Sequence, residues 1–179
     1  PDTAIKIGAA VEMVHGASLL HDDVIDATFV RRGQATLNAL EGNRFTVLLG
    51  DFLLCESLLA VSDLNQVVLV QVVSESVALM TLGQLLELAH QGDPFLAEAD
   101  YLRIVEGKTA SLMSCACKLG ALLGGANPDQ VAALGEFGLN LGIAFQIVDD
   151  VLDFWGDPKV LGKPVGSDLG EKKFTLPFL

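Results

Sequence analysis

The amino-acid sequence predicts an all-α fold, and three observations favour it. Apolar residues recur at helical spacing through most of the 179 residues, as at Ile7, Ala10, Val11 and Val14. The alternation of apolar and polar residues that is typical of strands never persists. Leu, Val and Ala supply most of the apolar residues, a mixture that favours helices. We expect a single domain, residues 1–179, because a chain of this length can bury one sizeable core.

Clusters of Gly, Pro, Asn and Asp predict where the helices begin and end. These breaks lie at 31–34, 41–43, 91–94, 124–129 and 156–170. Asn127 is suited to cap a helix that begins at Pro128. The predicted helices are 4–28, 34–40, 44–62, 64–90, 95–123, 128–154 and 172–179. No internal repeat stands out, so we expect a bundle of long antiparallel helices rather than a solenoid.

Charge and cysteine content narrow the classes of function. The formal net charge of −12 argues against nucleic acid as a partner, because a phosphate-binding surface needs a basic stripe. We expect no transmembrane span, since acidic residues interrupt the longest apolar region every dozen residues or sooner. Cys55, Cys115 and Cys117 show no spacing of a disulfide framework or zinc site, so we expect small core residues in a reducing, cytoplasmic compartment.

The sharpest motif is D-D-x-x-D, which occurs at residues 22–26 and again at 149–153. Residues four apart on a helix lie on one face, so the first and last acids of each cluster would form a pair. These pairs are Asp22 with Asp26 and Asp149 with Asp153. Paired carboxylates suit Mg²⁺, which also bridges to substrate phosphates. The alternative is a solvated acidic helix face, but each cluster follows an apolar helix, and the spacing excludes an EF-hand.

Each cluster continues a stripe along its helix. One stripe contains His15, Ser18, Asp22 and Asp26, and the other contains Gly142, Gln146, Asp149 and Asp153. If the two faces oppose one another, the acids form a charged mouth, and the small residues Ala17, Ser18 and Gly142 leave room below it for an apolar cavity. A ligand with an anionic head and a hydrocarbon tail would fit that shape. Alternatively, Gly142 and Ala17 only allow close helix packing.

Basic residues follow the acidic clusters. Arg31-Arg32-Gly33 comes just after the first cluster, and the arginine fork suits bidentate phosphate contacts. Gly107-Lys108-Thr109 resembles the end of a P-loop, but Leu102 stands where that motif requires Gly, which excludes it. Lys108, Lys163 and Lys173 are interpreted as point charges that reach a diphosphate, with ordinary surface lysines as the alternative. His21 is interpreted as a helix-packing residue.

The ordered motifs resemble those of trans-type polyprenyl diphosphate synthases. The segments that carry the resemblance run from residue 15 to 177 and read HGASLLHDDVIDATFVRRGQATLNALEG, LLGDFLL, EGKTASL, GIAFQIVDDVLDF and GKPVGSDLGEKKFTLP. The resemblance implies the isoprenoid synthase type of fold, with long helices around a central cavity, and a cytoplasmic homodimer. It implies that the enzyme joins an allylic diphosphate to isopentenyl diphosphate with about three Mg²⁺ ions bound.

The resemblance also assigns roles to residues. Asp22, Asp26, Asp149 and Asp153 would bind the metal ions, with Asp23 and Asp150 in support. The allylic diphosphate would be bound by Arg31, Lys108, Thr109, Gln146 and Lys163, with help from Lys173. His15 and Arg32 would bind isopentenyl diphosphate.

Product length is predicted from Ala17 and Ser18, where family members that make short products carry bulky aromatic residues. Small residues imply a deep pocket, so the sequence is most similar to octaprenyl to decaprenyl diphosphate synthases, which make the side chains of respiratory quinones such as ubiquinone, about C40 to C50. A farnesyl or geranylgeranyl synthase is the short-chain alternative. Two further alternatives are a non-catalytic subunit that regulates a partner and a terpene cyclase. The basic G-K-x-x-R-P element of the family is absent from residues 1–14, so we expect a piece that lacks N- and C-terminal helices.

Overall fold

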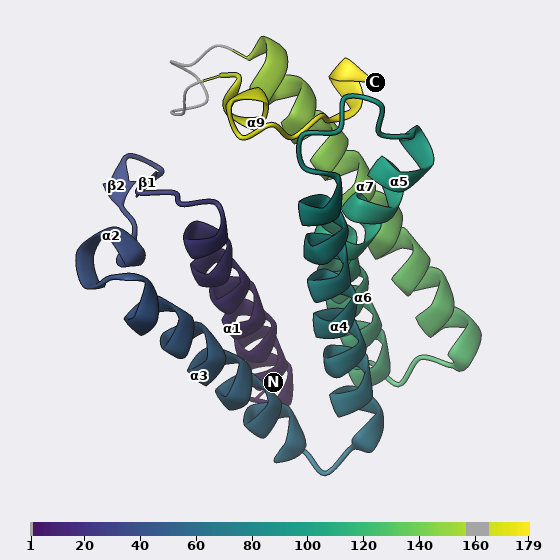
Figure 1. Ribbon diagram of the computed structural model, residues 1–179. Helices are drawn as coiled ribbons and strands as arrows, with labels where there is room; N and C mark the ends of the chain where they lie inside the picture. The colour runs from purple at the N-terminus through teal and green to yellow at the C-terminus, as the bar shows by residue number, and fades with distance from the viewer. Residues whose placement is uncertain (1, 157–164) are drawn as a thin grey trace. The chain divides into compact units, whose positions relative to one another are not determined.

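The structure of the protein is a computed structural model that describes residues 2–156 and 165–179. It confirms the all-α prediction, since long helices make up most of the described chain (Figure 1). The contacts between Cα atoms gather in two compact units, residues 1–74 and 75–179. The prediction of one domain and that of missing terminal helices both stay predictions.

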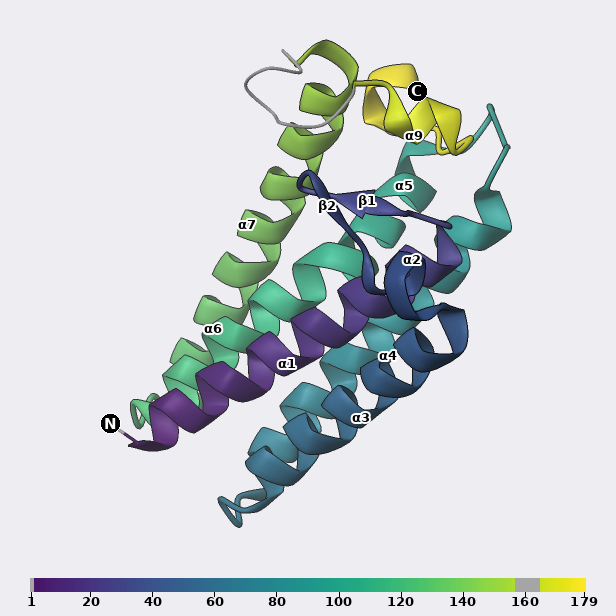
Figure 2. The ribbon, with the colours of Figure 1, turned by 90° about the vertical axis from the view of Figure 1, so that its left-hand side faces the viewer.

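The first unit is built on two long helices, α1 (Asp2–Ile25) and α3 (Asn43–Ser62), which lie side by side in Figures 1 and 2. The stripe Ile7, Ala10, Val14 and Ala17 is the buried apolar side of α1. Ser57 Oγ of α3 donates to the Ala10 carbonyl at 2.9 Å. The His21 ring lies so close to Gly50 that a Cβ there would overlap it, which confirms His21 as a packing residue.

A β-hairpin and a short helix join these two helices, and the sequence did not predict the hairpin. Strand β1 (Val30–Arg31) pairs antiparallel with β2 (Gln34–Ala35), and α2 (Leu37–Glu41) follows. The two turn residues, Arg32 and Gly33, have φ of 51° and 75°, as a tight hairpin turn with two positive φ values requires. The predicted helix bounds of 28 and 34 are therefore wrong by a few residues.

The second unit contains most of α4 (Val67–His90) and two further long helical segments. Helix α5 (Glu98–Val105), the π-helix η1 (Glu106–Ala110) and α6 (Ser111–Leu123) follow without a break, close to the predicted 95–123. Helix α7 (Pro128–Trp155) begins with the predicted cap, since Asn127 Oδ1 accepts from Gln130 N at 2.9 Å. The hydrophobic core of this unit contains the buried residues Leu96, Tyr101, Ile104 and Val105.

The chain after α7 does not form the helix predicted at 172–179. A single turn, α9 (Ser167–Gly170), is followed by the 3₁₀ turn η2 (Leu176–Phe178). Lys172 has φ of 59°, outside the range of a right-handed helix. An α-helix over 172–179 would also place Pro177 in its second turn, where the missing backbone N–H removes a hydrogen bond and the ring clashes with a carbonyl.

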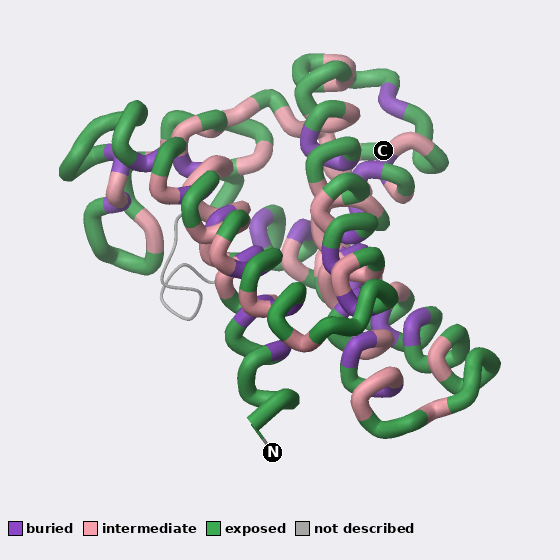
Figure 3. Tube along the Cα trace, turned by 90° about the horizontal axis from the view of Figure 1, so that it is seen from below, coloured by how far each residue is buried: buried purple, intermediate pink, exposed green. Residues whose placement is uncertain are grey.

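Three helices keep broad apolar surfaces. Helices α3, α4 and α7 are long and apolar enough to cross a membrane by length and composition alone. Exposed large side chains on them include Leu48, Phe52, Leu82, Phe137 and Phe145. Figure 3 shows exposed positions recurring along the helices between the buried ones. The expectations of no membrane span and of a cytoplasmic location stay predictions.

The three cysteines differ in environment. Cys115 is buried, as predicted, and burial raises the pKa of its thiol to about 11. Cys55 is exposed and Cys117 is half-buried, so the prediction that all three belong to the core is wrong for these two. The helical spacing explains the difference, because Cys115 is among the buried residues of α6 whereas Cys117 and, on α3, Cys55 are not.

Candidate active site

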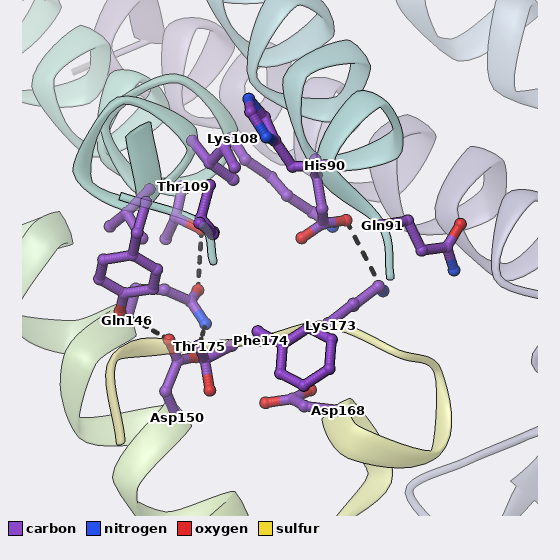
Figure 4. A pocket seen from close by; sticks show the side chains of 15 residues that line it. His90, Gln91, Lys108, Thr109, Gln146, Asp150, Asp168, Lys173, Phe174 and Thr175 are labelled. Carbon is purple, nitrogen blue, oxygen red and sulfur yellow. Dashed lines mark hydrogen bonds and ion pairs between the residues drawn. The ribbon is translucent and has the colours of Figure 1, made fainter. Parts of the chain in front are cut away.

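A cavity of about 130 Å³ lies within the second unit, between α4, the α5–η1 segment, α7 and the chain near α9. Figure 4 shows side chains from these elements pointing toward one another. Five of the residues that line it were predicted from the sequence: Lys108, Thr109, Gln146, Asp150 and Lys173. Other polar residues that line it were not predicted as site residues, among them Glu87, Tyr101 and Asp168.

The π-helix places Lys108 and Thr109 against α4. A Cβ on Gly83 would overlap the backbone nitrogen of Lys108 and lie 2.8 Å from the carbonyl carbon of Gly107. A Cβ on Gly107 would lie 2.8 Å from the Leu79 carbonyl oxygen. Only glycine allows the two backbones to meet at this distance. Single π turns inside α-helices are frequent at functional sites, and here the turn carries the Gly107-Lys108-Thr109 motif.

Two lysines of the cavity meet at one acid. Lys108 Nζ lies 2.6 Å from Glu87 Oε2, and Lys173 Nζ lies 3.6 Å from the same oxygen. Lys173 also pairs with Glu171 at 2.8 Å. The alternative that these are ordinary surface lysines is not supported, because their side chains are only 23% and 13% exposed.

Hydrogen bonds connect four side chains on another side of the cavity. Thr109 Oγ1 donates to Gln146 Oε1 at 2.8 Å, and Gln146 Nε2 donates to Asp150 Oδ1 at 2.8 Å. Tyr101 Oη donates to the other oxygen, Asp150 Oδ2, at 2.6 Å. Burial raises the pKa of Asp150 although both hydrogen bonds act to lower it. Both oxygens of Asp150 are thus held by protein donors, which suits the supporting role predicted for it.

Replacing Tyr101 by Phe is expected to destabilise the fold by about 1–3 kcal/mol, because it leaves a buried carboxylate with one donor fewer. Denaturant unfolding of the full-length protein would measure the change. The double variant with Asp150→Asn should lose less stability than the two single variants together, since the lost donor matters only to the carboxylate. Additive losses would contradict this assignment of the hydrogen bond.

The last and the first acid of the second cluster, Asp153 and Asp149, lie in different environments. Asp153 is buried, and its carboxylate accepts from Ser167 Oγ at 2.5 Å and from the Asp168 backbone nitrogen at 3.1 Å. It therefore ties α9 to the end of α7. Asp149 is half-buried and lies one turn before it. Metal binding by Asp149 and Asp153 stays a prediction, and Asp153 would have to exchange these contacts.

The first cluster, in the first unit, also has a buried middle acid. Asp23 is buried, and Arg31 donates to its Oδ1 from Nε at 2.9 Å and from a terminal nitrogen at 2.8 Å. Asn38 Nδ2 donates to the Asp23 carbonyl at 3.0 Å. Asp22 and Asp26 are half-buried on α1. In both clusters the middle acid is therefore bound inside the protein, while the first acid remains partly accessible.

Other predicted residues of the first unit lie on α1 and the hairpin. His15 is exposed on α1, and Arg32 is exposed in the hairpin turn. Ala17 is fully buried, whereas Ser18 is half-buried and donates from Oγ to the His15 carbonyl at 2.8 Å. The two acidic clusters belong to different units, so their facing one another stays a prediction. Lys163 lies outside the described residues.

Gly142 allows close packing of two helical segments and does not leave room for a ligand. A Cβ on Gly142 would lie 2.5 Å from the Cα and 2.8 Å from the Cβ of Ala110. The space beside it is thus filled by η1, and room for a ligand at this position was wrongly predicted. The missing side chain of Gly142 instead lets α7 approach the π-helix and brings Gln146, one turn later, within reach of Thr109.

The donor chemistry of the acidic clusters fits Mg²⁺. Within residues 2–156 and 165–179, no group of three or more His, Cys, Asp or Glu side chains is arranged to hold a metal ion. The accessible acids Asp22, Asp26 and Asp149 offer oxygen ligands, which are the ligands that Mg²⁺ prefers. An ion that keeps several waters and binds substrate phosphates needs only one or two protein carboxylates, so these residues fit such an ion.

Comparisons with known proteins agree with these motifs. The family model described as polyprenyl synthetase matches residues 1–179. The octaprenyl diphosphate synthase of Escherichia coli K12 is 41% identical over 98% of this chain and 54% of that protein. The geranylgeranyl diphosphate synthase of Mycobacterium tuberculosis H37Rv is 43% identical over 97% of this chain and 51% of that protein.

A solved structure shows the same fold. The polyprenyl synthase from Caulobacter crescentus CB15, complexed with calcium and isoprenyl diphosphate, superposes with a TM-score of 0.94. It is 38% identical, and the match covers 99% of this chain and 54% of that one. The chain thus spans about half the length of the curated relatives it matches.

Proposed function

Because this chain belongs to the polyprenyl synthetase family, we propose that the protein condenses an allylic diphosphate with successive units of isopentenyl diphosphate. The observation that carries the proposal is the meeting of Lys108, Thr109, Gln146 and Lys173 around one cavity. Each of these was predicted from the sequence to bind the allylic diphosphate. Two lysines and a hydroxyl in a partly buried site suit a diphosphate head.

The reaction begins when the bond between the allylic carbon and the diphosphate oxygen breaks. The leaving diphosphate keeps the electron pair, and the double bond of isopentenyl diphosphate attacks the allylic cation to form the new carbon–carbon bond. The positive charge moves to the tertiary carbon of the added unit, which then loses a proton from the neighbouring carbon to form the new double bond. Lys108 and Lys173 stabilise the charge that grows on the diphosphate. Thr109, which donates to Gln146 in the structure, would turn its hydroxyl toward the diphosphate to orient it. Gln146 is itself held by Asp150. Arg31, fixed by Asp23, and Lys163 complete the proposed contacts to this substrate, and His15 and Arg32 bind isopentenyl diphosphate.

Magnesium belongs to the same proposal. The carboxylates of Asp22, Asp26 and Asp149, with Asp153 after exchange of its contacts, would hold about three Mg²⁺ ions, which supply positive charge for the leaving diphosphate. We also propose a homodimer, from family likeness.

A long-chain product, about C40 to C50, is the finer proposal. The relatives differ in product, since one is an octaprenyl and another a geranylgeranyl synthase, so family membership leaves the length open. The support comes from the small side chains of Ala17 and Ser18. Side chains of ubiquinone and other respiratory quinones have this length.

Replacing Ser18 by Phe is expected to shorten the product by several isoprene units, because the ring would fill the chain-length pocket that we propose beside the first cluster. Ser18 is a better site than Ala17, whose full burial would make Phe overpack the helix and cost about 1–3 kcal/mol of stability. Chromatography of the extracted prenols would measure the length. Ser62→Phe, at an exposed position of α3, is the control. An unchanged product spectrum in Ser18→Phe would refute the pocket.

The proposed function is tested by incubating the full-length protein with farnesyl diphosphate, labelled isopentenyl diphosphate and Mg²⁺. Products near C40 to C50 would support the whole proposal, and a product that stops at C20 would keep the reaction and overturn the long-chain assignment. No elongation by the protein alone would favour the regulatory subunit, and a cyclised hydrocarbon from the allylic substrate alone would favour a terpene cyclase.

A further inference from the structure

Glu87 is an acid of the cavity for which the proposed function gives no role. It lies on α4 with its side chain 17% exposed, and its Oε2 atom faces the ammonium groups of Lys108 and Lys173 at 2.6 and 3.6 Å. Gln84, one turn earlier, donates from Nε2 to the same oxygen at 3.3 Å. One carboxylate oxygen thus occupies the position where the two lysines converge.

The charges explain why an acid stands there. Two ammonium groups that approach one oxygen atom lie close together, and their repulsion is poorly screened where the side chains are mostly buried. Glu87 offsets this repulsion and holds both groups on the same side of the cavity. It therefore keeps Lys108 and Lys173 ready for a larger anion.

The same contacts oppose a diphosphate. A diphosphate that binds both lysines must take the position of the Glu87 oxygen, because two anions in contact repel one another. Gln84 gives the displaced carboxylate a donor on its own helix. When diphosphate binds to or leaves the two lysines, it therefore exchanges with the carboxylate of Glu87.

We propose that Glu87 is a positioning residue that holds Lys108 and Lys173 together and competes with diphosphate for them. The inference rests on the proposed function and extends it to product release. Each elongation step leaves one inorganic diphosphate, and the return of Glu87 to the lysines helps to expel it. An enzyme that repeats the step many times gains from this exchange.

Glu87→Gln tests the competition, because it removes the charge and keeps the shape. Inorganic diphosphate with Mg²⁺ should bind the full-length variant at least about fivefold more tightly in titration calorimetry, the lower end of usual coupling between binding events. In steady-state assays with farnesyl diphosphate, KM and kcat should both fall, since substrate binds more tightly and diphosphate leaves more slowly. Glu87→Asp keeps the charge and should remain closer to wild type in all three quantities.

Glu171→Gln is the matched control. Glu171 also pairs with Lys173, but it does not line the cavity and its side chain is 36% exposed. Loss of this charge should change diphosphate binding by less than about twofold, as expected for an exposed ion pair.

Other outcomes separate the inference from the function on which it rests. If the wild type elongates but Glu87→Gln binds diphosphate equally or less tightly, Glu87 does not compete and the inference fails alone. A fall in kcat with unchanged KM and unchanged diphosphate affinity would indicate a merely structural role and also overturn it. A wild type that neither elongates nor binds diphosphate would overturn the proposed function together with the inference.

Discussion

Replacing Lys108 by Met is expected to lower kcat/KM for the allylic diphosphate by about 100- to 1,000-fold, the usual effect of removing one group that stabilises developing negative charge. Met keeps most of the aliphatic stem, so the π-helix and its contact with Gly83 should persist. The loss should appear in kcat as well as in KM, because charge on the diphosphate grows as the carbon–oxygen bond breaks. Steady-state kinetics with farnesyl diphosphate would measure both.

Lys118→Met is the control for this variant. Lys118 is a half-buried lysine of α6 whose stem packs over Gly135, and it does not line the cavity. Its replacement should leave kcat/KM within about twofold of wild type, as for most substitutions away from a site. Equal losses in the two variants would indicate a general effect of positive charge and would contradict a specific role for Lys108.

Replacing Asp22 by Asn is expected to reduce activity by at least about 100-fold, since changes of residues that merely support metal ligands already cost about 10–100-fold. The amide is nearly isosteric with the carboxylate but is neutral and a weaker ligand for a hard cation. Activity measured against Mg²⁺ concentration should need much more metal to reach half its maximum.

Glu12→Gln controls for loss of a negative charge on the same helix, because Glu12 is exposed on α1 well before the cluster. Its dependence on Mg²⁺ should match that of the wild type. A normal metal requirement in Asp22→Asn would remove Asp22 from the proposed metal site.

The sequence predicted the helices well because hydrophobic periodicity and capping are local signals. Asn127 and Pro128 placed the start of α7 correctly. The hairpin after α1 was missed, because strands of two residues leave no alternation to detect. The final helix was wrong because the conformation of Lys172, in the left-handed region, depends on its setting, and the effect of Pro177 was underestimated.

The residues of the candidate site that belong to sequence motifs were predictable. The residues that join the site only through contacts made in the folded chain were not. The resemblance named Lys108, Thr109, Gln146 and Lys173 as ligands of one diphosphate, and the structure brings them to one cavity. No pattern distinguished Glu87 from the other acids of the apolar helices, and Tyr101 is a lone aromatic among aliphatic residues. Their importance arises from contacts with residues 21 and 49 positions away, respectively, which only the fold reveals.

The central claim is that the cavity beside η1 binds the allylic diphosphate, and a crystal structure of the full-length protein with Mg²⁺ and an unreactive farnesyl thiodiphosphate tests it most directly. The account predicts diphosphate oxygens within hydrogen-bond distance of Lys108 Nζ and Thr109 Oγ1, with metal ions at Asp22 and Asp149. A diphosphate bound elsewhere, with Lys108 still paired to Glu87, would contradict it.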